Sequence, residues 1–278
     1  MREIVMAEEA GFCFGVRRAV EAIEGVLSEG GTLWSIGMPI HNPQEVARLR
    51  ARGLNVTKSA NEIPEGARVL IRAHGESKAV TEDLDARKMR LTDATCPFVR
   101  RAQERAEELS SQGYAVVLLG DARHPEIRAV MGYARGPVDV VASAQDTERL
   151  PKRPRVALIS QTTQREDLLA AVAAALVPRA GELHVCNTVC RATLNRQDAV
   201  RRLAGKVDGL VLIGGRNSAN TAKLRDIAEA GGMDVLWIET SEELTREWFG
   251  EKDQIGVAAG ASTPQWLITE ICSKIARM

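Results

Sequence analysis

The chain has 278 residues, enough for one large domain or for two to three small ones. Its 37 Lys and Arg residues balance 37 Asp and Glu residues, so no bulk charge attracts it to nucleic acid or to an anionic membrane. The first residues are acidic where a signal peptide needs an apolar core, and no apolar run approaches the ~18 residues of a membrane-spanning helix. We therefore expect a cytoplasmic protein with neither a membrane nor a nucleic-acid partner.

Strand and helix patterns alternate along the whole chain. The predicted strands cover residues 2–7, 32–36, 54–57, 68–73, 89–94, 114–119, 138–142, 155–160, 182–187, 209–213, 234–238 and 254–258. The predicted helices cover residues 14–28, 43–52, 77–88, 98–111, 125–133, 165–176, 196–206, 219–230, 242–249 and 264–276. This alternation is typical of parallel sheets with right-handed helical crossovers, which bind ligands beyond the carboxyl ends of their strands.

One motif occurs twice in the sequence. Residues 13–19 read Cys-Phe-Gly-Val-Arg-Arg-Ala, and residues 96–102 read Cys-Pro-Phe-Val-Arg-Arg-Ala. Cys190 opens a third, similar helix, and a glycine that ends an apolar run follows each of the three cysteines after 24 residues. Such a fixed period indicates related structural units. We predict an α/β fold of three parallel-sheet units, related by a pseudo-threefold axis around a central site.

The predicted unit boundaries follow the cysteines. The units comprise residues 13–95, 96–189 and 190–278. The third unit lacks the final strand that the other two possess, so we expect the N-terminal strand, within residues 1–12, to complete it. Because the strands of each unit end near a cysteine, this architecture directs the three thiols towards one place.

The three cysteines of the repeat suggest a metal centre. Cys13, Cys96 and Cys190 are separated by 83 and 94 residues, which excludes a local Cys-x-x-Cys clip. A helix N-terminus favours the thiolate form that metals require. Three converging thiolates suit an iron–sulfur cluster with one iron that has no cysteine ligand. Zinc held by three cysteines and a histidine, or three buried thiols without metal, are the alternatives.

The two remaining cysteines lie outside this repeat. Cys186 falls on an apolar strand and Cys272 in the last helix, so we interpret both as inert buried thiols. The spacing of Cys186 and Cys190 also allows them to act as a pair of ligands.

Polar side chains follow the predicted strands at matched positions. The histidines among them are His41, His74 and His124, whereas we interpret His184 as an ordinary surface or core residue. The hydroxyl and amide residues are Thr162, Thr163, Ser218, Asn220 and Ser262. Small hydroxyl residues directly before helices bind anionic oxygens through backbone N–H groups and the helix dipole, and histidines add charge-assisted hydrogen bonds. We predict a small phosphate or diphosphate ligand beside the metal.

Glu126 is the acidic residue that we expect to transfer protons. It lies two residues from His124, on the same predicted loop. The alternative is a solvated glutamate in the first turn of a helix.

Eight motifs, distributed over essentially the whole chain, resemble the 4-hydroxy-3-methylbut-2-enyl diphosphate reductase family. They are Gly-Phe-Cys-Phe-Gly-Val at 11–16, His-Asn at 41–42, Ala-His-Gly at 73–75, Asp-Ala-Thr-Cys-Pro at 93–97, His-Pro-Glu at 124–126, Ser-Gln-Thr-Thr at 160–163, Cys-x-Ala-Thr-x-Asn-Arg-Gln at 190–197 and Gly-Ala-Ser-Thr-Pro at 260–264. The resemblance implies three α/β domains around a 4Fe-4S cluster, held by Cys13, Cys96 and Cys190, with one open iron. It also implies an electron donor such as ferredoxin or flavodoxin.

The implied reaction removes the hydroxyl of (E)-4-hydroxy-3-methylbut-2-enyl diphosphate as water, with two electrons and two protons. Its products are isopentenyl and dimethylallyl diphosphate, the end of the non-mevalonate isoprenoid pathway. The residues that the resemblance assigns to the diphosphate are His41, His74, His124, Ser218, Asn220 and Ser262. It makes Glu126 the proton relay, assisted by His124, and has Thr162, with Thr163, order the hydroxyl and a water. Family members often have serine where this chain has Ala219, so we expect altered diphosphate affinity.

Two other functions deserve comparison. Quinolinate synthase resembles the predicted architecture, with three α/β domains and a three-cysteine cluster, but its motifs do not match these loops. A non-catalytic iron–sulfur sensor or electron carrier would not need three histidines and three hydroxyl-bearing loops around an open iron.

Overall fold

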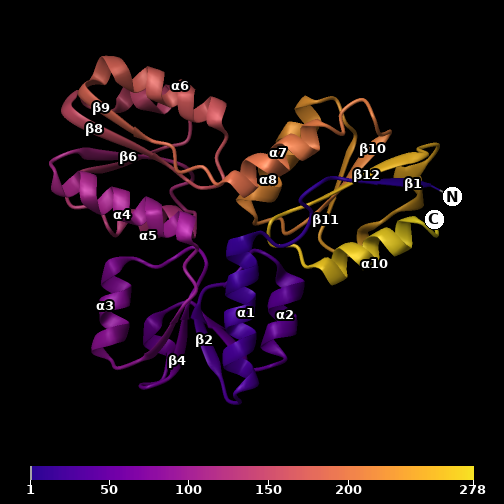
Figure 1. Cartoon of the computed structure of the whole chain (residues 1–278), viewed down its shortest axis with the longest axis horizontal. Coiled ribbons are helices and arrows are strands. Elements are labelled where there is room, and N and C mark those ends of the chain that lie inside the picture. The colour runs from indigo at the N-terminus through magenta and orange to yellow at the C-terminus, as the bar shows by residue number, and fades with distance from the viewer. Residues whose placement is uncertain (1) are drawn as a thin grey trace. The chain divides into compact units, whose positions relative to one another are not determined.

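The computed structural model describes residues 2–278 (Figure 1). Its strands are β1 (Glu3–Met6), β2 (Leu33–Ile36), β3 (Leu54–Thr57), β4 (Arg68–Ile71), β5 (Arg90–Asp93), β6 (Ala115–Leu119), β7 (Val138–Val141), β8 (Arg153–Ser160), β9 (Ala180–Cys186), β10 (Gly209–Ile213), β11 (Val235–Ile238) and β12 (Gln254–Ala259). Its α-helices are α1 (Phe14–Ser28), α2 (Pro43–Arg50), α3 (Lys78–Ala86), α4 (Pro97–Ser111), α5 (Pro125–Met131), α6 (Glu166–Leu176), α7 (Arg191–Arg201), α8 (Ala219–Ala230), α9 (Arg246–Phe249) and α10 (Gln265–Ile275).

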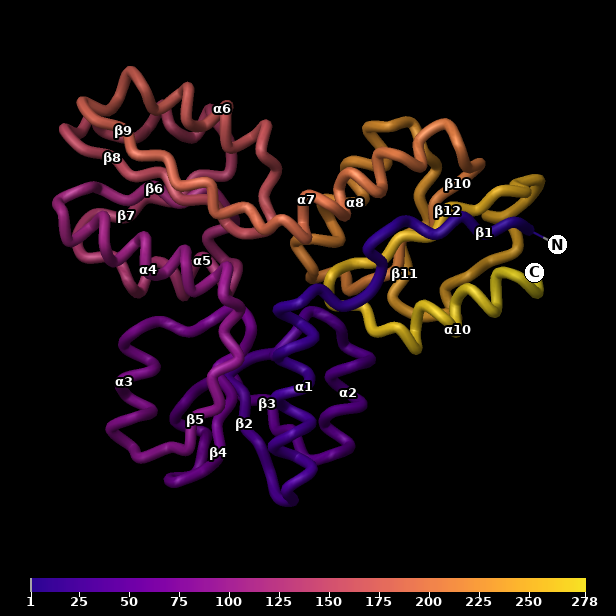
Figure 2. Tube along the Cα trace, viewed as in Figure 1, coloured from indigo at the N-terminus to yellow at the C-terminus, as the bar shows by residue number. Residues whose placement is uncertain are grey.

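The strands form three four-stranded sheets in which every pairing is parallel. Their orders are β3-β2-β4-β5, β7-β6-β8-β9 and β1-β12-β10-β11. The third order, read from β11, repeats the first two with β1 as its last strand. Figures 1 and 2 show β1 beside β12, the pairing expected for the N-terminal strand. The predicted fold class, α/β with three parallel sheets, is confirmed.

The chain divides into two compact units. The first comprises residues 2–17, 40–51 and 191–278 and contains the sheet β1-β12-β10-β11; the second comprises residues 18–39 and 52–190 and contains the other two sheets. The three-unit boundaries drawn from the cysteines stay a prediction.

Alternating side chains bury both faces of the central strands. In the first unit, Val211 and Ile213 of β10 pack with α10, whereas Leu210 and Leu212 pack with α7 and α8, on the opposite face in Figure 1. In the second unit, four of the five buried residues of β6 divide in the same way: Val116 and Leu118 pack with α4 and α5, whereas Val117 and Leu119 pack with α6 on the other face. Apolar runs buried on both faces are typical of parallel sheets covered by helices.

Two predicted helices differ from the structure. The helix predicted at 196–206 is α7, which begins directly after Cys190 and ends at Arg201. The apolar spacing hid this start, because α7 buries polar side chains such as Thr193 and Gln197. The helix predicted at 242–249 is a 3₁₀ turn, Ser241–Glu243, followed by the short α9, because a capping box between Thr240 and Glu243 closes that turn.

The strand predicted at 155–160 begins two residues earlier than expected, because β8 starts at Arg153. Arg153 already pairs with β9, whereas pairing with β6 begins only at Val156, so Pro154 precedes the two-sided part of the strand and its missing N–H disrupts no central ladder. None of the helices in residues 2–278 has the length and apolar character that a bilayer crossing requires.

Candidate active site

Most of the predicted site residues gather near the switch points of two of the three sheets, beyond the carboxyl ends of central strands, where a parallel sheet offers a crevice for a ligand. In an open parallel sheet, ligands bind where the connections leave two neighbouring strands in opposite directions. In the second unit this point lies between β6 and β8, where Gly120 faces the Gln161 side chain; in the first unit it lies between β10 and β12, where Gly214 faces Thr221. An added Cβ on Gly120 would lie 2.7 Å from Gln161 Oε1, and one on Gly214 would lie 2.7 Å from Thr221 Oγ1. Glycine at these positions therefore admits polar side chains to the strand ends.

Glu126 is buried in the crevice of the second unit. It is the second residue of α5 and is 2% exposed. The Thr162 backbone N–H donates to Glu126 Oε1 at 2.6 Å, and the Thr162 hydroxyl donates to Oε2 at 2.8 Å. Burial raises the pKa of Glu126 to about 7, although the two hydrogen bonds from Thr162 act to lower it. The alternative of a solvated glutamate is wrong, and this carboxyl can release or accept a proton at neutral pH.

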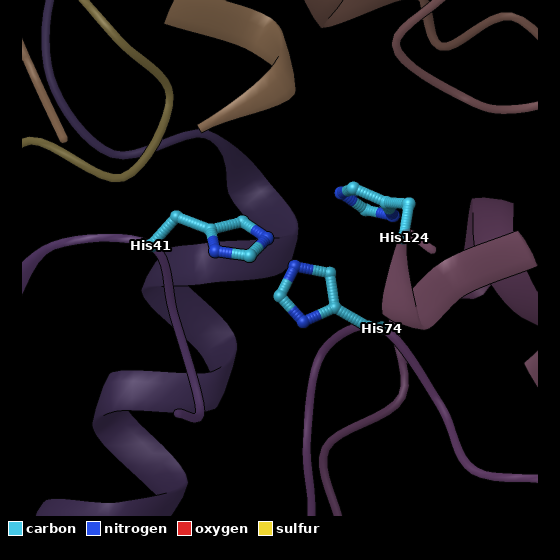
Figure 3. Close-up of side chains that lie close together, drawn as sticks. All are labelled: His41, His74 and His124. Atoms are coloured by element: carbon cyan, nitrogen blue, oxygen red, sulfur yellow. The ribbon is translucent and has the colours of Figure 1, made fainter. Parts of the chain in front are cut away.

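His124 and His74 lie together beside this carboxyl. Their ring centroids are 5.5 Å apart, with the rings edge to face. Figure 3 shows the two rings next to each other. His124 caps α5, and its Nδ1 accepts the Glu126 backbone N–H at 3.2 Å. This bond assigns the proton of a neutral His124 ring to Nε2, which makes Nε2 a hydrogen-bond donor.

Gln161 connects the ends of β6 and β8 and was not among the predicted residues. Its Oε1 accepts the Asp121 backbone N–H at 3.2 Å, and its Nε2 donates to Thr163 Oγ1 at 3.2 Å. The Thr163 hydroxyl accepts this bond and keeps its own proton for another acceptor. Its position directly after β8, next to Thr162, is the sequence signal that identifies Gln161.

The crevice of the first unit holds the hydroxyl and amide residues. Ser218 caps α8, where its Oγ accepts the Thr221 backbone N–H at 3.3 Å, and Ala219 is the first helical residue. Ser262 follows β12, and its Oγ donates to the His41 backbone carbonyl at 3.0 Å. The first unit therefore brings His41 and Ser262 together.

Asn220 is the clearest sign of a ligand in this crevice. It is 5% exposed, yet within residues 2–278 neither its Oδ1 nor its Nδ2 has a hydrogen-bond partner. The buried Thr221 Oγ1 shares this property. Buried polar atoms are rarely left unpaired because each costs roughly 1–3 kcal/mol, so an oxygen-rich ligand is expected here. Thr221 was not predicted as a site residue, although it directly follows Asn220 in the sequence.

The three repeat cysteines share one backbone arrangement. Each precedes or opens a helix: Cys13 precedes α1, Cys96 caps α4, and Cys190 precedes α7. Each backbone N–H donates to a carbonyl in the polar loop after a strand of the same unit. The acceptors are Ala261 for Cys13 at 2.9 Å, Ala73 for Cys96 at 3.0 Å and Thr162 for Cys190 at 2.8 Å. Every cysteine is thus fixed to a loop that carries a predicted substrate contact: Ser262, His74 or Thr162.

The chemistry of these thiols fits a thiolate-held cluster. All three are partly exposed, and the Val16 backbone N–H points at Cys13 Sγ at 3.5 Å. In contrast, burial raises the pKa of Cys186 and of Cys272, which keeps both as neutral thiols. Cys186 packs into the apolar layer between β6 and α4, as expected for a buried thiol. That Cys13 meets Cys96 and Cys190 at a single cluster stays a prediction.

Comparison with known proteins identifies the family. The model of the LytB protein family matches residues 4–276. The chain belongs to the LytB family. Among curated LytB relatives, the 4-hydroxy-3-methylbut-2-enyl diphosphate reductase of Geobacter sulfurreducens is 45% identical over 274 residues, covering 98% of this chain and 96% of that protein. The reductase of the same name from Aquifex aeolicus is 41% identical over 279 residues, covering 99% and 96%.

Solved structures agree with this assignment to the LytB family. A structure of (E)-4-hydroxy-3-methyl-but-2-enyl diphosphate reductase, the terminal enzyme of the non-mevalonate pathway, matches with a TM-score of 0.74 and 41% identity over the full length of both chains. The E-1-hydroxy-2-methyl-but-2-enyl-4-diphosphate reductase of Plasmodium falciparum shares the fold, with a TM-score of 0.92 at 24% identity, covering 98% of this chain and 87% of that one. The family resemblance drawn from the eight motifs is confirmed.

Proposed function

We propose that this chain is a 4-hydroxy-3-methylbut-2-enyl diphosphate reductase. The observation that carries the proposal is the identity of 41–45% to reductases of this name over nearly the whole of both chains. The reaction breaks the C–OH bond of (E)-4-hydroxy-3-methylbut-2-enyl diphosphate. Two electrons and two protons convert the hydroxyl to water and the allylic carbon skeleton to isopentenyl or dimethylallyl diphosphate.

We further propose that Cys13, Cys96 and Cys190 hold a 4Fe-4S cluster with one open iron. Their shared position at helix N-termini and the N–H directed at Cys13 Sγ support this assignment. When bound, the cluster would supply the two electrons and a Lewis acid for the departing hydroxyl. A soluble electron donor in the cytoplasm, such as ferredoxin or flavodoxin, would reduce the oxidised cluster again.

The diphosphate is assigned to the histidines and the small polar residues. His41, Ser218 and Ser262 precede or connect helices of the first unit, and Asn220 lies in the first turn of α8. The unpaired amide of Asn220 supports an anionic oxygen ligand there. His74 and His124 are assigned to the same diphosphate from the second unit. The Nε2–H of His124 is suited to this role because its Nδ1 already accepts the Glu126 N–H.

The proton for the departing hydroxyl is assigned to Glu126. A carboxyl with a pKa of about 7 is partly protonated at neutral pH, which suits a general acid. Thr162 orients both carboxyl oxygens of Glu126 through two hydrogen bonds. The hydroxyls of Thr162 and Thr163 are also assigned to position the substrate hydroxyl and a water molecule. Burial of the site excludes bulk water, which would otherwise compete for the proton.

Anaerobic purification and a single assay test the proposal. The protein is expected to be brown, and after reduction it should convert the hydroxylated diphosphate to the two five-carbon diphosphates. A colourless protein that contains zinc would contradict the cluster. A brown protein that binds the substrate without turnover would instead indicate a sensor.

A further inference from the structure

The second unit contains a cavity of about 550 Å³ apart from the crevice of Glu126. It lies at the carboxyl edge of the sheet β3-β2-β4-β5, under the start of α3 and along α5. Its polar and charged walls are formed by Gly37, Lys58, Arg72, Glu76, Ser77 and Arg128. Glu126, Thr162, His74 and His124 are not among the residues that line it.

The charges in this cavity are predominantly positive. Lys58, Arg72 and Arg128 face one carboxylate, Glu76. Arg72 and Glu76 form an ion pair with Nε and Oε1 2.7 Å apart, and their side chains are only 14% and 11% exposed. Arg128 also acts electrostatically on Glu76. Glu76 is the one carboxylate among the described residues that line the cavity, so the three cations exceed it by two positive charges.

Arg72 occupies the ligand position of its sheet. The neighbours β2 and β4 send their connections to opposite sides, so the crevice between their carboxyl ends is the switch point of this sheet. Gly37 ends β2 with a φ of +73°, and an added Cβ would lie 2.5 Å from Arg72 Nη1. Glycine at this position therefore makes room for the guanidinium, much as Gly120 makes room for Gln161 in the neighbouring sheet.

The helix α3 adds to the positive potential. Ser77 caps this nine-residue helix, and Ser77 and Val80 of its first turn line the cavity. A helix N-terminus carries partial positive charge and unsatisfied N–H groups, both of which attract anions. Three cations, a helix N-terminus and an open switch point thus coincide in one cavity.

A purely structural role explains only part of this arrangement. The pair Arg72–Glu76 closes the loop that carries His74, and the Gly75 N–H donates to the Arg72 carbonyl at 2.9 Å. That explains Arg72 and Glu76. It does not explain why Lys58 and Arg128, from two other parts of the chain, line the same cavity.

We propose that this cavity is a second anion site that binds a small molecule through a phosphate or diphosphate group. Arg72 can offer its guanidinium edge in a bidentate contact, while Lys58 and Arg128 neutralise the remaining charge. The site is distinct from the one assigned to the substrate diphosphate, and its occupant contacts the arginine that begins the His74 loop.

Calorimetric titration of the full-length holoprotein with inorganic pyrophosphate tests the proposal. Two binding events are expected. The double variant Lys58→Ala/Arg128→Ala should raise the dissociation constant of one binding event by about tenfold or more and leave that of the other unchanged. The reason is that the variant removes two charge-assisted hydrogen bonds to the pyrophosphate. The matched control is Arg123→Ala, which removes a cation that is 93% exposed next to α5 but outside the cavity.

The variant Asn220→Ala separates this site from the substrate site. It should remove the event that the double variant retains and leave the cavity event unchanged. Both altered cations are exposed, so equal melting temperatures for the double variant and the wild type would show that folding is intact. A single event in the wild type that only Asn220→Ala removes, or two events that the double variant leaves unchanged, would overturn the proposal.

Discussion

Thr162 holds both oxygens of the buried Glu126 carboxyl, one through its backbone N–H at 2.6 Å and the other through its hydroxyl at 2.8 Å. The same residue accepts the Cys190 N–H through its carbonyl at 2.8 Å. Thr162 therefore contacts both the proposed proton relay, Glu126, and the backbone of a proposed cluster ligand, Cys190. Since burial and the Thr162 bonds shift the pKa of Glu126 in opposite directions, the result near 7 depends on both.

Replacement of Glu126 by glutamine should abolish most turnover but retain cluster colour and substrate binding. Glutamine keeps the size, and its Oε1 can still accept the Thr162 N–H. Its Nε2 can donate to the Thr162 hydroxyl in place of the bond that Oε2 accepted, but glutamine cannot supply the proton. The expected loss in kcat is about 100-fold to 10,000-fold, the usual contribution of a general acid. Single-turnover kinetics of the reduced enzyme measure it, with Glu104→Gln on the exposed face of α4 as the control. A rate near that of the wild type would remove Glu126 from the mechanism.

The same variant should change how stability depends on pH. The folded-state pKa of Glu126 is raised from 4.5 to about 7, so the folded protein binds a proton more tightly than the unfolded chain does. The resulting stabilisation is fully present below pH 4.5 and is lost as pH rises through about 7. The shift corresponds to roughly 3 kcal/mol at most. Glu126→Gln should therefore match the wild type near pH 5 and exceed its melting temperature near pH 8; parallel pH curves for the two proteins would contradict this prediction.

Removal of the Thr162 hydroxyl should move the pH profile of the reaction. Valine has the shape of threonine but cannot donate to Glu126 Oε2, so Thr162→Val removes one bond that favours the ionised carboxyl. The pKa of Glu126 then rises further, and the pH above which kcat declines should rise with it. Thr162→Ser keeps the hydroxyl and should keep the wild-type profile. If Thr162→Val lowered kcat equally at every pH, the hydroxyl would be contacting only the substrate.

Ser262→Ala should raise KM much more than it changes kcat. The substitution removes a hydroxyl assigned to the diphosphate. The one proton of this hydroxyl is donated to the His41 carbonyl at 3.0 Å in the structure and would turn to the diphosphate when the substrate binds. Loss of a hydrogen bond to a charged group predicts an increase in KM of about tenfold. Ser273→Ala, on the exposed side of α10, is the matched control. A fall in kcat with an unchanged KM would place Ser262 in the chemical step instead.

The alternation of apolar runs and helical patterns was sufficient to predict the three parallel sheets. β6 and β10 consist almost entirely of apolar residues, so their two-sided burial could be read directly from the sequence. The start of α7 was indicated by the cysteine repeat but not by the apolar pattern, because the buried side chains of this helix include Thr193, Arg196 and Gln197. Apolar periodicity does not detect a helix face that packs polar groups.

The sequence was sufficient to name the polar residues of the site from their positions after strands. It was not sufficient to predict the hydrogen bonds that these residues form. The sequence suggested Glu126 as a proton carrier, yet the two bonds from Thr162, 36 residues away, depend on the pairing of β6 with β8. Likewise, the backbone bonds from the three cysteines to Ala261, Ala73 and Thr162 join segments that are distant in sequence. A repeat period reveals equivalent positions, whereas only the folded chain shows which atoms meet.

Replacement of the cysteines should divide them into two classes. Alanine at Cys13, Cys96 or Cys190 is expected to eliminate the brown colour and most of the bound iron, because each would remove one of three protein ligands. Alanine at Cys186 should retain colour and iron, since this thiol lies 9% exposed among apolar side chains and burial keeps it neutral. Cys186→Ala should lower the free energy of unfolding by only about 1 kcal/mol, because it removes one buried sulfur atom. Iron content per chain and visible absorbance of anaerobically purified variants measure both effects, and full iron content in Cys13→Ala would exclude Cys13 as a ligand.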